Sequence, residues 1–254
     1  MKTKQFDYYQ EIGDWDFDNI KCITKRKTNW DFYEEIGKNV DEKSLCLDLG
    51  TGGGEALLKN YPNVGMVIGT DFSDKMLKTA NKNLEKYPEK RVKFAQMDNL
   101  KMTFPEEIFD LISARHTVID AKQIYSSLKP GGVLVIEGVD KTDCWDLKEI
   151  FGRGQCYNDE IAISKKDYLD LKEAGFSKIE KVEILEDEYY ETKEELMKLL
   201  LKAPILDDFS EIRENNFVHV KKVDQELFDK YVEQNTTKDG ILLKRVLYGI
   251  VAKK

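Results

Sequence analysis

Cysteine, histidine, proline and long apolar runs are all scarce in this chain. Its 254 residues include four cysteines, two histidines and five prolines. The cysteines show neither C-x-x-C pairing nor metal-ligand spacing, so we expect reduced thiols and no bound metal. The first residues lack the apolar core of a signal peptide, and no apolar run approaches membrane-spanning length. These absences predict a cytoplasmic protein that does not insert into a membrane.

An excess of positive charge is also absent. The chain has 40 basic and 48 acidic residues, which gives a formal net charge of −8. Bulk electrostatics therefore argue against nucleic acid as a partner, although a local basic patch would still be compatible with one. The chain is 41% hydrophobic and 35% charged, a composition typical of globular proteins. Its length suits one large α/β domain with additional elements, or two small domains.

Alternate glycines follow an apolar stretch near the end of the first fifth of the chain. Residues 45–49 read as a buried strand, and four glycines, three of them at alternate positions, then precede a helix-forming segment. A turn without β-carbons allows a ligand to lie against bare backbone. The spacing Asp48-x-Gly50-x-Gly52-x-Gly54 resembles the first motif of the class I S-adenosylmethionine-dependent methyltransferases.

The glycine motif of nicotinamide enzymes, G-x-G-x-x-G/A, is the main alternative for this turn. Gly50 and Gly52 fit its first two places, but Glu55 occupies the third. A carboxylate at that place would repel a pyrophosphate, which S-adenosylmethionine does not contain. The cationic ammonium and sulfonium of S-adenosylmethionine suit an acidic turn better, so the methyltransferase interpretation is favoured.

Acidic or amide residues also end the next two predicted strands. Asp71 follows a continuous apolar strand about twenty positions beyond the glycines, where it can accept hydrogen bonds from both ribose hydroxyls. Phe72 is then placed to lie against an adenine face. The alternative role for Asp71 is N-cap of the helix that carries Met76. At Asp98-Asn99, the resemblance implies an acceptor for the adenine amino group.

The segment Leu-Lys-Pro-Gly-Gly at 128–132 is a further mark of the same superfamily. The resemblance implies S-adenosylmethionine as cofactor and S-adenosylhomocysteine as product. The predicted cofactor-binding residues are Asp48, Gly50, Thr51, Gly52, Gly54, Asp71, Phe72, Met76, Asp98, Asn99, Ala114 and Arg115.

The resemblance also implies the architecture. We expect a Rossmann-like α/β fold: a seven-stranded, mostly parallel sheet with helices on both faces, its last strand antiparallel between the fifth and sixth. The whole chain, 1–254, is then a single methyltransferase domain. Its expected parts are an N-terminal helical lid at 1–43, a cofactor-binding core at 44–140, sheet-completing segments at 141–190 and 241–254, and a helical insertion or cap at 191–240. The insertion has two alternatives, an added packing layer or a dimer contact.

Aromatic residues concentrate before the first strand. Trp30, Tyr33 and Ile36 lie at helical spacing, with Asn29 as a candidate N-cap. This helix either packs on the sheet edge or, as in related small-molecule enzymes, folds over the substrate. The candidate substrate-binding residues are Trp15, Trp30, Tyr33 and Arg153. An ordinary loop arginine is the alternative for the last of these.

His116 is the candidate catalytic residue. It follows the fourth predicted strand, nearest the expected position of the transferring methyl, and an imidazole can take a proton from a hydroxyl or amine. Its alternative is to hold the loop or touch the cofactor backbone. Arg115 is a candidate partner for the methionyl carboxylate.

Two absences bear on the acceptor. Ser113-Ala114-Arg115-His116 is not the Asn/Asp-Pro-Pro-aromatic motif of base or glutamine N-methyltransferases, and no cysteine follows a proline as in cytosine-carbon enzymes. We therefore expect metal-independent methyl transfer to a small-molecule O or N nucleophile by in-line displacement. The alternatives are an RNA or protein methyltransferase, a non-catalytic S-adenosylmethionine-binding regulator and, more distantly, a dinucleotide oxidoreductase. A monomer or a homodimer is expected.

Overall fold

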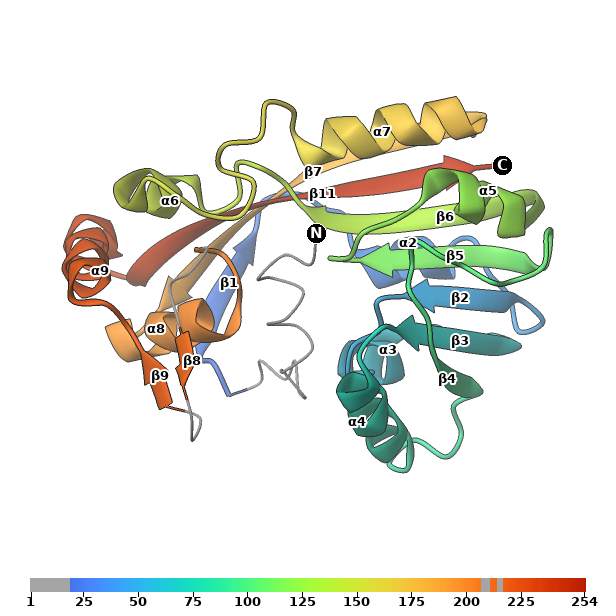
Figure 1. Cartoon of the computed structure of the whole chain (residues 1–254), viewed down its shortest axis with the longest axis horizontal. Helices are drawn as coiled ribbons and strands as arrows, with labels where there is room; N and C mark the ends of the chain where they lie inside the picture. Colours follow the sequence, from blue (N-terminus) through green and yellow to red (C-terminus); the bar gives the residue numbers. More distant parts are fainter. Residues whose placement is uncertain (1–18, 207–210, 214–216) are drawn as a thin grey trace.

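Figure 1 shows the computed structural model of the chain, which describes residues 19–206, 211–213 and 217–254. Within these ranges, nine strands form the central sheet, in the order β1-β7-β11-β6-β5-β2-β3-β4 with β10 paired to β11, and β8 and β9 pair separately. The strands are β1 Cys22–Arg26, β2 Leu45–Leu49, β3 Met66–Asp71, β4 Val92–Gln96, β5 Phe109–Arg115, β6 Leu128–Val139, β7 Lys178–Tyr190, β8 Glu211–Arg213, β9 Phe217–His219, β10 Thr236–Thr237 and β11 Gly240–Lys253.

Parallel pairing joins β4, β3, β2, β5 and β6, whereas β11 runs antiparallel to both β6 and β7. This confirms the predicted Rossmann-like α/β class and the antiparallel last strand between its two neighbours. The described sheet has nine strands rather than seven, because β1 adds to the edge at β7 and the short β10 pairs with β11.

Helices cover both faces of the sheet. The helices are α2 Phe32–Gly37, α3 Glu55–Asn60, α4 Asp74–Leu84, α5 Ala121–Ser127, α6 Trp145–Phe151, α7 Ile163–Ala174, α8 Lys193–Lys202 and α9 Lys222–Asn235. On one face, α5 and α7 bury Ile124 and Leu171 against the sheet. On the other, α2 and α3 bury Ile36 and Leu58. None of the helices in the described ranges has the length and apolar character needed to cross a membrane.

The described part of the expected N-terminal lid, residues 19–43, contains a strand as well as a helix. In β1, the β-branched residues Ile23 and Thr24 pair antiparallel with Tyr189 and Glu188 of β7. The helix α2 begins after Asp31, whose carboxylate accepts hydrogen bonds from the N–H groups of Tyr33 and Glu34 at 3.0 and 3.1 Å. Asp31, not Asn29, is therefore the N-cap.

The insertion at 191–240 carries the two predicted helices, α8 and α9. Thr192 caps α8 by accepting a hydrogen bond from the Glu195 N–H at 3.3 Å. Together with α6, these helices pack around the outer ends of β7 and β11 and form a second apolar cluster (Figure 1). Its most deeply buried members include Leu147, Leu196, Leu200, Phe228, Tyr231 and Leu243. The insertion thus shares this second core with α6, β7 and β11, and its role as a cap stays a prediction.

A buried ion cluster joins the loop before α6 to β7 and β11. The Arg245 guanidinium on β11 contacts both carboxylate oxygens of Asp143, at 2.9 and 3.1 Å, and Glu188 of β7 at 3.1 Å. Asp143, whose side chain is 1% exposed, also accepts the Val246 N–H at 2.9 Å. A bidentate, buried arrangement of this kind holds three segments in one register.

Removal of Asp143 should be costly, because it leaves the Arg245 guanidinium buried with one partner fewer. We expect Asp143→Ala to lower the free energy of unfolding by about 3–5 kcal/mol in urea denaturation. The matched control is Asp146→Ala, which removes a carboxylate 41% exposed and paired with Lys244 at the surface. That variant should lose less than about 1 kcal/mol. Equal losses in both variants would contradict a supporting role for the buried cluster.

Candidate functional site

The candidate site lies where β2, β3, β4, β5 and β6 end, because the carboxyl ends of parallel strands meet at one edge of a sheet. The glycine turn connects β2 to α3 at this edge. Gly50, Gly52 and Gly54 all have left-handed backbones, with φ of 69°, 58° and 75°. Thr51 closes the turn by donating its N–H to the Thr70 carbonyl at 2.9 Å.

Asp71, at the end of β3, supports the glycine turn. One carboxylate oxygen accepts the Gly52 N–H at 3.0 Å, and the other accepts the Ser73 N–H at 2.8 Å. Burial raises the pKa of Asp71, while these N–H groups oppose the rise. Each carboxylate oxygen can accept a further hydrogen bond, so the side chain keeps capacity for a ligand's hydroxyl groups. The N-cap of α4 is Ser73, whose hydroxyl accepts the Met76 N–H at 3.3 Å.

Asn99, just beyond β4, presents a buried acceptor. Its amide nitrogen donates to the Thr117 hydroxyl at 3.0 Å and to the Val118 carbonyl at 3.4 Å. Its side-chain oxygen is buried and has no hydrogen-bond partner in the part of the chain that the structure describes. An unpaired buried acceptor costs about 1–3 kcal/mol, and a ligand's amino group would remove that cost. Asp98, by contrast, is exposed and accepts the Leu100 N–H at 2.9 Å.

Gly50 is required by the protein's own packing. A β-carbon there would lie 2.6 Å from the Cβ of Thr117, which follows β5. The Thr117 side chain therefore takes the space beside this glycine, on the side where a bare backbone was expected to meet a ligand. Two open hollows lie elsewhere: one of about 630 Å³ is lined by residues 20–23, 189, 191 and 236–241, and one of about 200 Å³ by residues 26–31 and 34.

Asp48 is buried beneath the turn. Its carboxylate accepts a hydrogen bond from the Ser113 hydroxyl at 2.7 Å, and that hydroxyl lies 3.4 Å from the Tyr61 hydroxyl. The parallel register places Asp48 directly beside Ser113. Burial raises the pKa of Asp48 to about 6, although the hydrogen bond from Ser113 opposes the rise.

His116 and Arg115 meet Glu137 at the ends of β5 and β6. The Nε2 of His116 lies 3.3 Å from Glu137 Oε1, and the nearest guanidinium nitrogen of Arg115 lies 3.8 Å from the same oxygen. Burial would raise the pKa of Glu137, but His116 and Arg115 together hold it below its ordinary value. The Arg115 guanidinium also lies 6.0 Å from the centre of the Tyr33 ring.

The remaining predicted residues have different environments. Phe72 is half-buried, and Met76 is 2% exposed inside α4. The side chain of Ala114 packs in the apolar core, so only its backbone can face the strand ends. Trp30 lies over Gly249 of β11. A β-carbon added to Gly249 would come within 2.6 Å of the Trp30 ring.

Arg153 lies away from the strand ends, in the second apolar cluster's neighbourhood. It pairs with Asp224, a carboxylate 1% exposed at the start of α9, at 2.8 Å, and its guanidinium lies over the Phe151 ring. The structure therefore does not bring Arg153 together with the other candidates. Trp15 lies outside the described residues.

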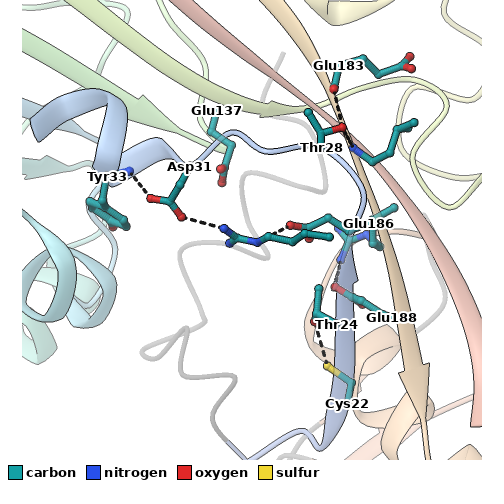
Figure 2. A network of polar contacts seen from close by, with 12 residues as sticks. Cys22, Thr24, Thr28, Asp31, Tyr33, Glu137, Glu183, Glu186 and Glu188 are labelled. Atoms are coloured by element: carbon teal, nitrogen blue, oxygen red, sulfur yellow. Dashed lines mark hydrogen bonds and ion pairs between the residues drawn. The ribbon is translucent and has the colours of Figure 1, made fainter. Parts of the chain in front are cut away.

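A charged network beside Glu137 was not predicted from the sequence. Arg26 of β1 pairs with Asp31 at 2.9 Å and with Glu186 at 3.0 Å. Glu137 reaches toward this pair from β6 (Figure 2). The sequence did contain a signal for Glu137, because this residue follows an apolar strand segment as Asp48 and Asp71 do. Its contact with His116, however, depends on the register of β5 and β6.

Comparisons with known proteins identify a family. The sequence model of a family described as "Methyltransferase domain" matches residues 41–203. The chain is 31% identical over 132 residues to a demethylmenaquinone methyltransferase of Lactococcus lactis, covering 47% of this chain and 52% of that protein. It is 29% identical over 166 residues to phosphoethanolamine N-methyltransferase 1 of Zea mays, covering 60% of this chain and 32% of that protein. The chain thus matches about half or less of the length of these relatives.

Solved structures share the fold. The YcgJ protein from Bacillus subtilis superposes with a TM-score of 0.58 at 14% identity, covering 87% of this chain and 96% of that one. Phosphoethanolamine N-methyltransferase 2 from Haemonchus contortus, in complex with phosphomonomethylethanolamine and S-adenosylhomocysteine, superposes with a TM-score of 0.54 at 20% identity. It covers 89% of this chain and 53% of that one. At these identities the likeness shows the fold alone.

The contact between Gly50 and Thr117 leads to a prediction about stability. Gly50→Ala introduces both a left-handed alanine, costing about 1–2 kcal/mol, and a clash, costing about 1–3 kcal/mol more. The control is Gly152→Ala, where φ is 63° but nothing lies within 4 Å of the new β-carbon. Thermal unfolding should show a larger loss of stability for Gly50→Ala than for Gly152→Ala. Adding Thr117→Gly to Gly50→Ala should restore only the part of the loss that the clash causes. Equal losses at both glycines would contradict the close contact.

The buried carboxylate of Asp48 leads to a pH prediction. Its pKa is about 6 when folded, against an ordinary 3.8, so the folded state keeps a proton that the unfolded chain has released. The free energy of unfolding of the ligand-free protein should therefore fall as pH rises from about 4 to about 6, by at most about 3 kcal/mol. Asp48→Asn should flatten this dependence in urea denaturation. Parallel pH curves for the two proteins would show that Asp48 is not desolvated.

Proposed function

This chain belongs to the methyltransferase-domain family, within the class I S-adenosylmethionine-dependent superfamily, and we propose that it transfers a methyl group to a small-molecule acceptor at oxygen or nitrogen. The observation that carries the proposal is the pair of buried acceptors at neighbouring strand ends, Asp71 and Asn99, beside the glycine turn. They match the hydroxyl and amino donors of an adenosine. The names of two relatives, with demethylmenaquinone and phosphoethanolamine as acceptors, support a small-molecule acceptor, and the second name supports a nitrogen nucleophile.

The proposed roles follow from the chemistry of each side chain. Asp71 accepts hydrogen bonds from the ribose hydroxyls, and Asn99 accepts one from the adenine amino group. Asp48 faces the methionyl ammonium, and Arg115 the methionyl carboxylate. S-adenosylmethionine supplies an electrophilic methyl carbon on a sulfonium. The protein aligns the acceptor with that carbon and excludes water, while His116 takes the acceptor's proton.

The proposal extends to the organisation of the whole chain. Residues 1–43 and 191–240 contribute cover and acceptor contacts around the cofactor-binding core at 44–140, including Trp30 and Tyr33 from the N-terminal part. We further propose a cytoplasmic enzyme that is a monomer or a homodimer.

Cofactor binding tests the proposal first. Asp71→Ala should raise the dissociation constant for S-adenosylmethionine by at least about tenfold in isothermal titration calorimetry, because ribose hydrogen bonds are lost. The control is Glu173→Ala, which removes an equal charge from a carboxylate 69% exposed and paired with Lys122. That variant should bind as the unaltered protein does. Unchanged affinity in Asp71→Ala would remove Asp71 from the site.

Turnover separates the proposed enzyme from its alternatives. Formation of S-adenosylhomocysteine should depend on an added acceptor in a panel of hydroxyl- and amine-bearing small molecules. Cofactor binding without acceptor-dependent turnover would instead identify a regulatory protein. Salt-sensitive association with RNA, together with methylation of it, would favour an RNA methyltransferase. Binding of NAD(H) in place of S-adenosylmethionine would contradict the proposal altogether.

A further inference from the structure

His116 has a strained backbone. Its φ is +52°, a left-handed value that residues with a β-carbon rarely adopt. The conformation turns the chain so that the residue contacts β6 twice. The His116 N–H donates to the Glu137 carbonyl at 2.8 Å, and its Nε2 lies 3.3 Å from the Glu137 carboxylate. Both contacts are made to a single residue of the neighbouring strand.

The Glu137 carboxylate is well suited to hold an imidazole. Its side chain is 14% exposed, and its lowered pKa means that it is ionised throughout the neutral range. The parallel register pairs Arg115 with Glu137, which brings β5 and β6 together at this point. The charged and titratable groups facing this carboxylate come from every neighbouring element: Arg26, Asp31, Tyr33, Arg115, His116 and Glu186.

The other candidate bases nearby are poorly suited. Burial raises the pKa of both Tyr33 and Tyr61, so each phenol keeps its proton near neutral pH. Glu186 already accepts a hydrogen bond from Arg26 at 3.0 Å. The imidazole is the group that ordinarily exchanges a proton between pH 5 and 8. In the described ranges of the chain, its Nδ1 makes no hydrogen bond, while Nε2 faces Glu137.

We infer that Glu137 is a positioning residue for His116: it fixes the Nε2–H tautomer of the imidazole and so leaves Nδ1 to accept the acceptor's proton. The tautomer is assigned from the contact to the carboxylate. This inference rests on the proposed function and adds to it the atom that takes the proton. The same logic, a base oriented by a third group, recurs across unrelated active sites.

The proton balance of the step restricts the acceptor. The acceptor's hydroxyl or amine proton passes to Nδ1, and its electron pair bonds to the methyl carbon. The pair of the broken carbon–sulfur bond stays on sulfur, so the sulfonium charge is replaced by an imidazolium charge. Glu137 then lies against that imidazolium and stabilises it. The acceptor must therefore carry a dissociable proton on the atom that is methylated.

Imidazole nitrogen NMR tests the tautomer without any acceptor. The chain has two histidines, so the signal of His116 is assigned by comparison with His116→Gln. In the unaltered protein, above the pH at which the ring titrates, we expect a protonated Nε2 and an unprotonated Nδ1. Glu137→Leu has no hydrogen-bond acceptor at this position, so this variant should lose the preference for the Nε2–H tautomer. A mixed tautomer in the unaltered protein, or no change in the variant, would overturn the inference.

The pH profile of kcat tests the charge. Glu137→Gln keeps a hydrogen-bond acceptor but loses the negative charge, so the imidazolium is less stable and the acidic limb should move to lower pH by about one unit. The dissociation constant for S-adenosylmethionine should not change. Glu186→Gln is the matched control, because its side chain is 13% exposed and bonds to Arg26 rather than to His116. Its acidic limb should stay in place.

A double-variant cycle separates positioning from general support of the fold. His116→Ala should lower kcat by about 100-fold, and Glu137→Leu should lower it no further in that background. Fully additive losses in kcat would reject the inference. A changed cofactor affinity in Glu137→Gln, with an acidic limb that does not move, would also reject it and would show that Glu137 acts by holding Arg115. The proposed function fails on different grounds, namely absent cofactor binding or absent turnover, and the NMR result stands apart from both.

Discussion

The parallel register of the central strands is the constraint on which the site depends. Backbone hydrogen bonds between β2, β3 and β5 place Asp48 beside Gly69 and Ser113, and those between β5 and β6 place Arg115 beside Glu137. Because parallel strands end at one edge, polar residues far apart in the sequence meet there. A shift by one residue would turn each of these side chains to the opposite face of the sheet.

The strand ends also concentrate features that folding alone disfavours. Asp48 and Asp71 are buried carboxyl groups with raised pKa values, and Asn99 has an unpaired buried oxygen. His116 is held in a left-handed conformation. Such unfavourable features persist only where the surrounding packing enforces them, and here the apolar clusters on both sheet faces do so. These features gather at the edge of the sheet where the candidate site lies.

Two helix caps and one strand show where local sequence patterns were insufficient. Asn29 and Asp31 have similar capping propensity, and only the geometry of the loop from β1 selects Asp31. Asp71 had two interpretations from the sequence, and the structure gives the cap of α4 to Ser73 instead. The strand β1 is short and exposed, with little periodicity to reveal it, and forms because β7 offers an unpaired edge.

The sequence by itself determined the fold class, the glycine turn and the acidic residues that end β2 and β3. These are local signals, since apolar runs and glycine spacing reflect the needs of a buried strand and a tight turn. Only the tertiary structure decided that Glu137 meets His116, that Thr117 packs on Gly50, and that Arg153 pairs with Asp224 in the insertion. Each of these contacts joins segments brought together by strand register or helix packing, which no local pattern encodes.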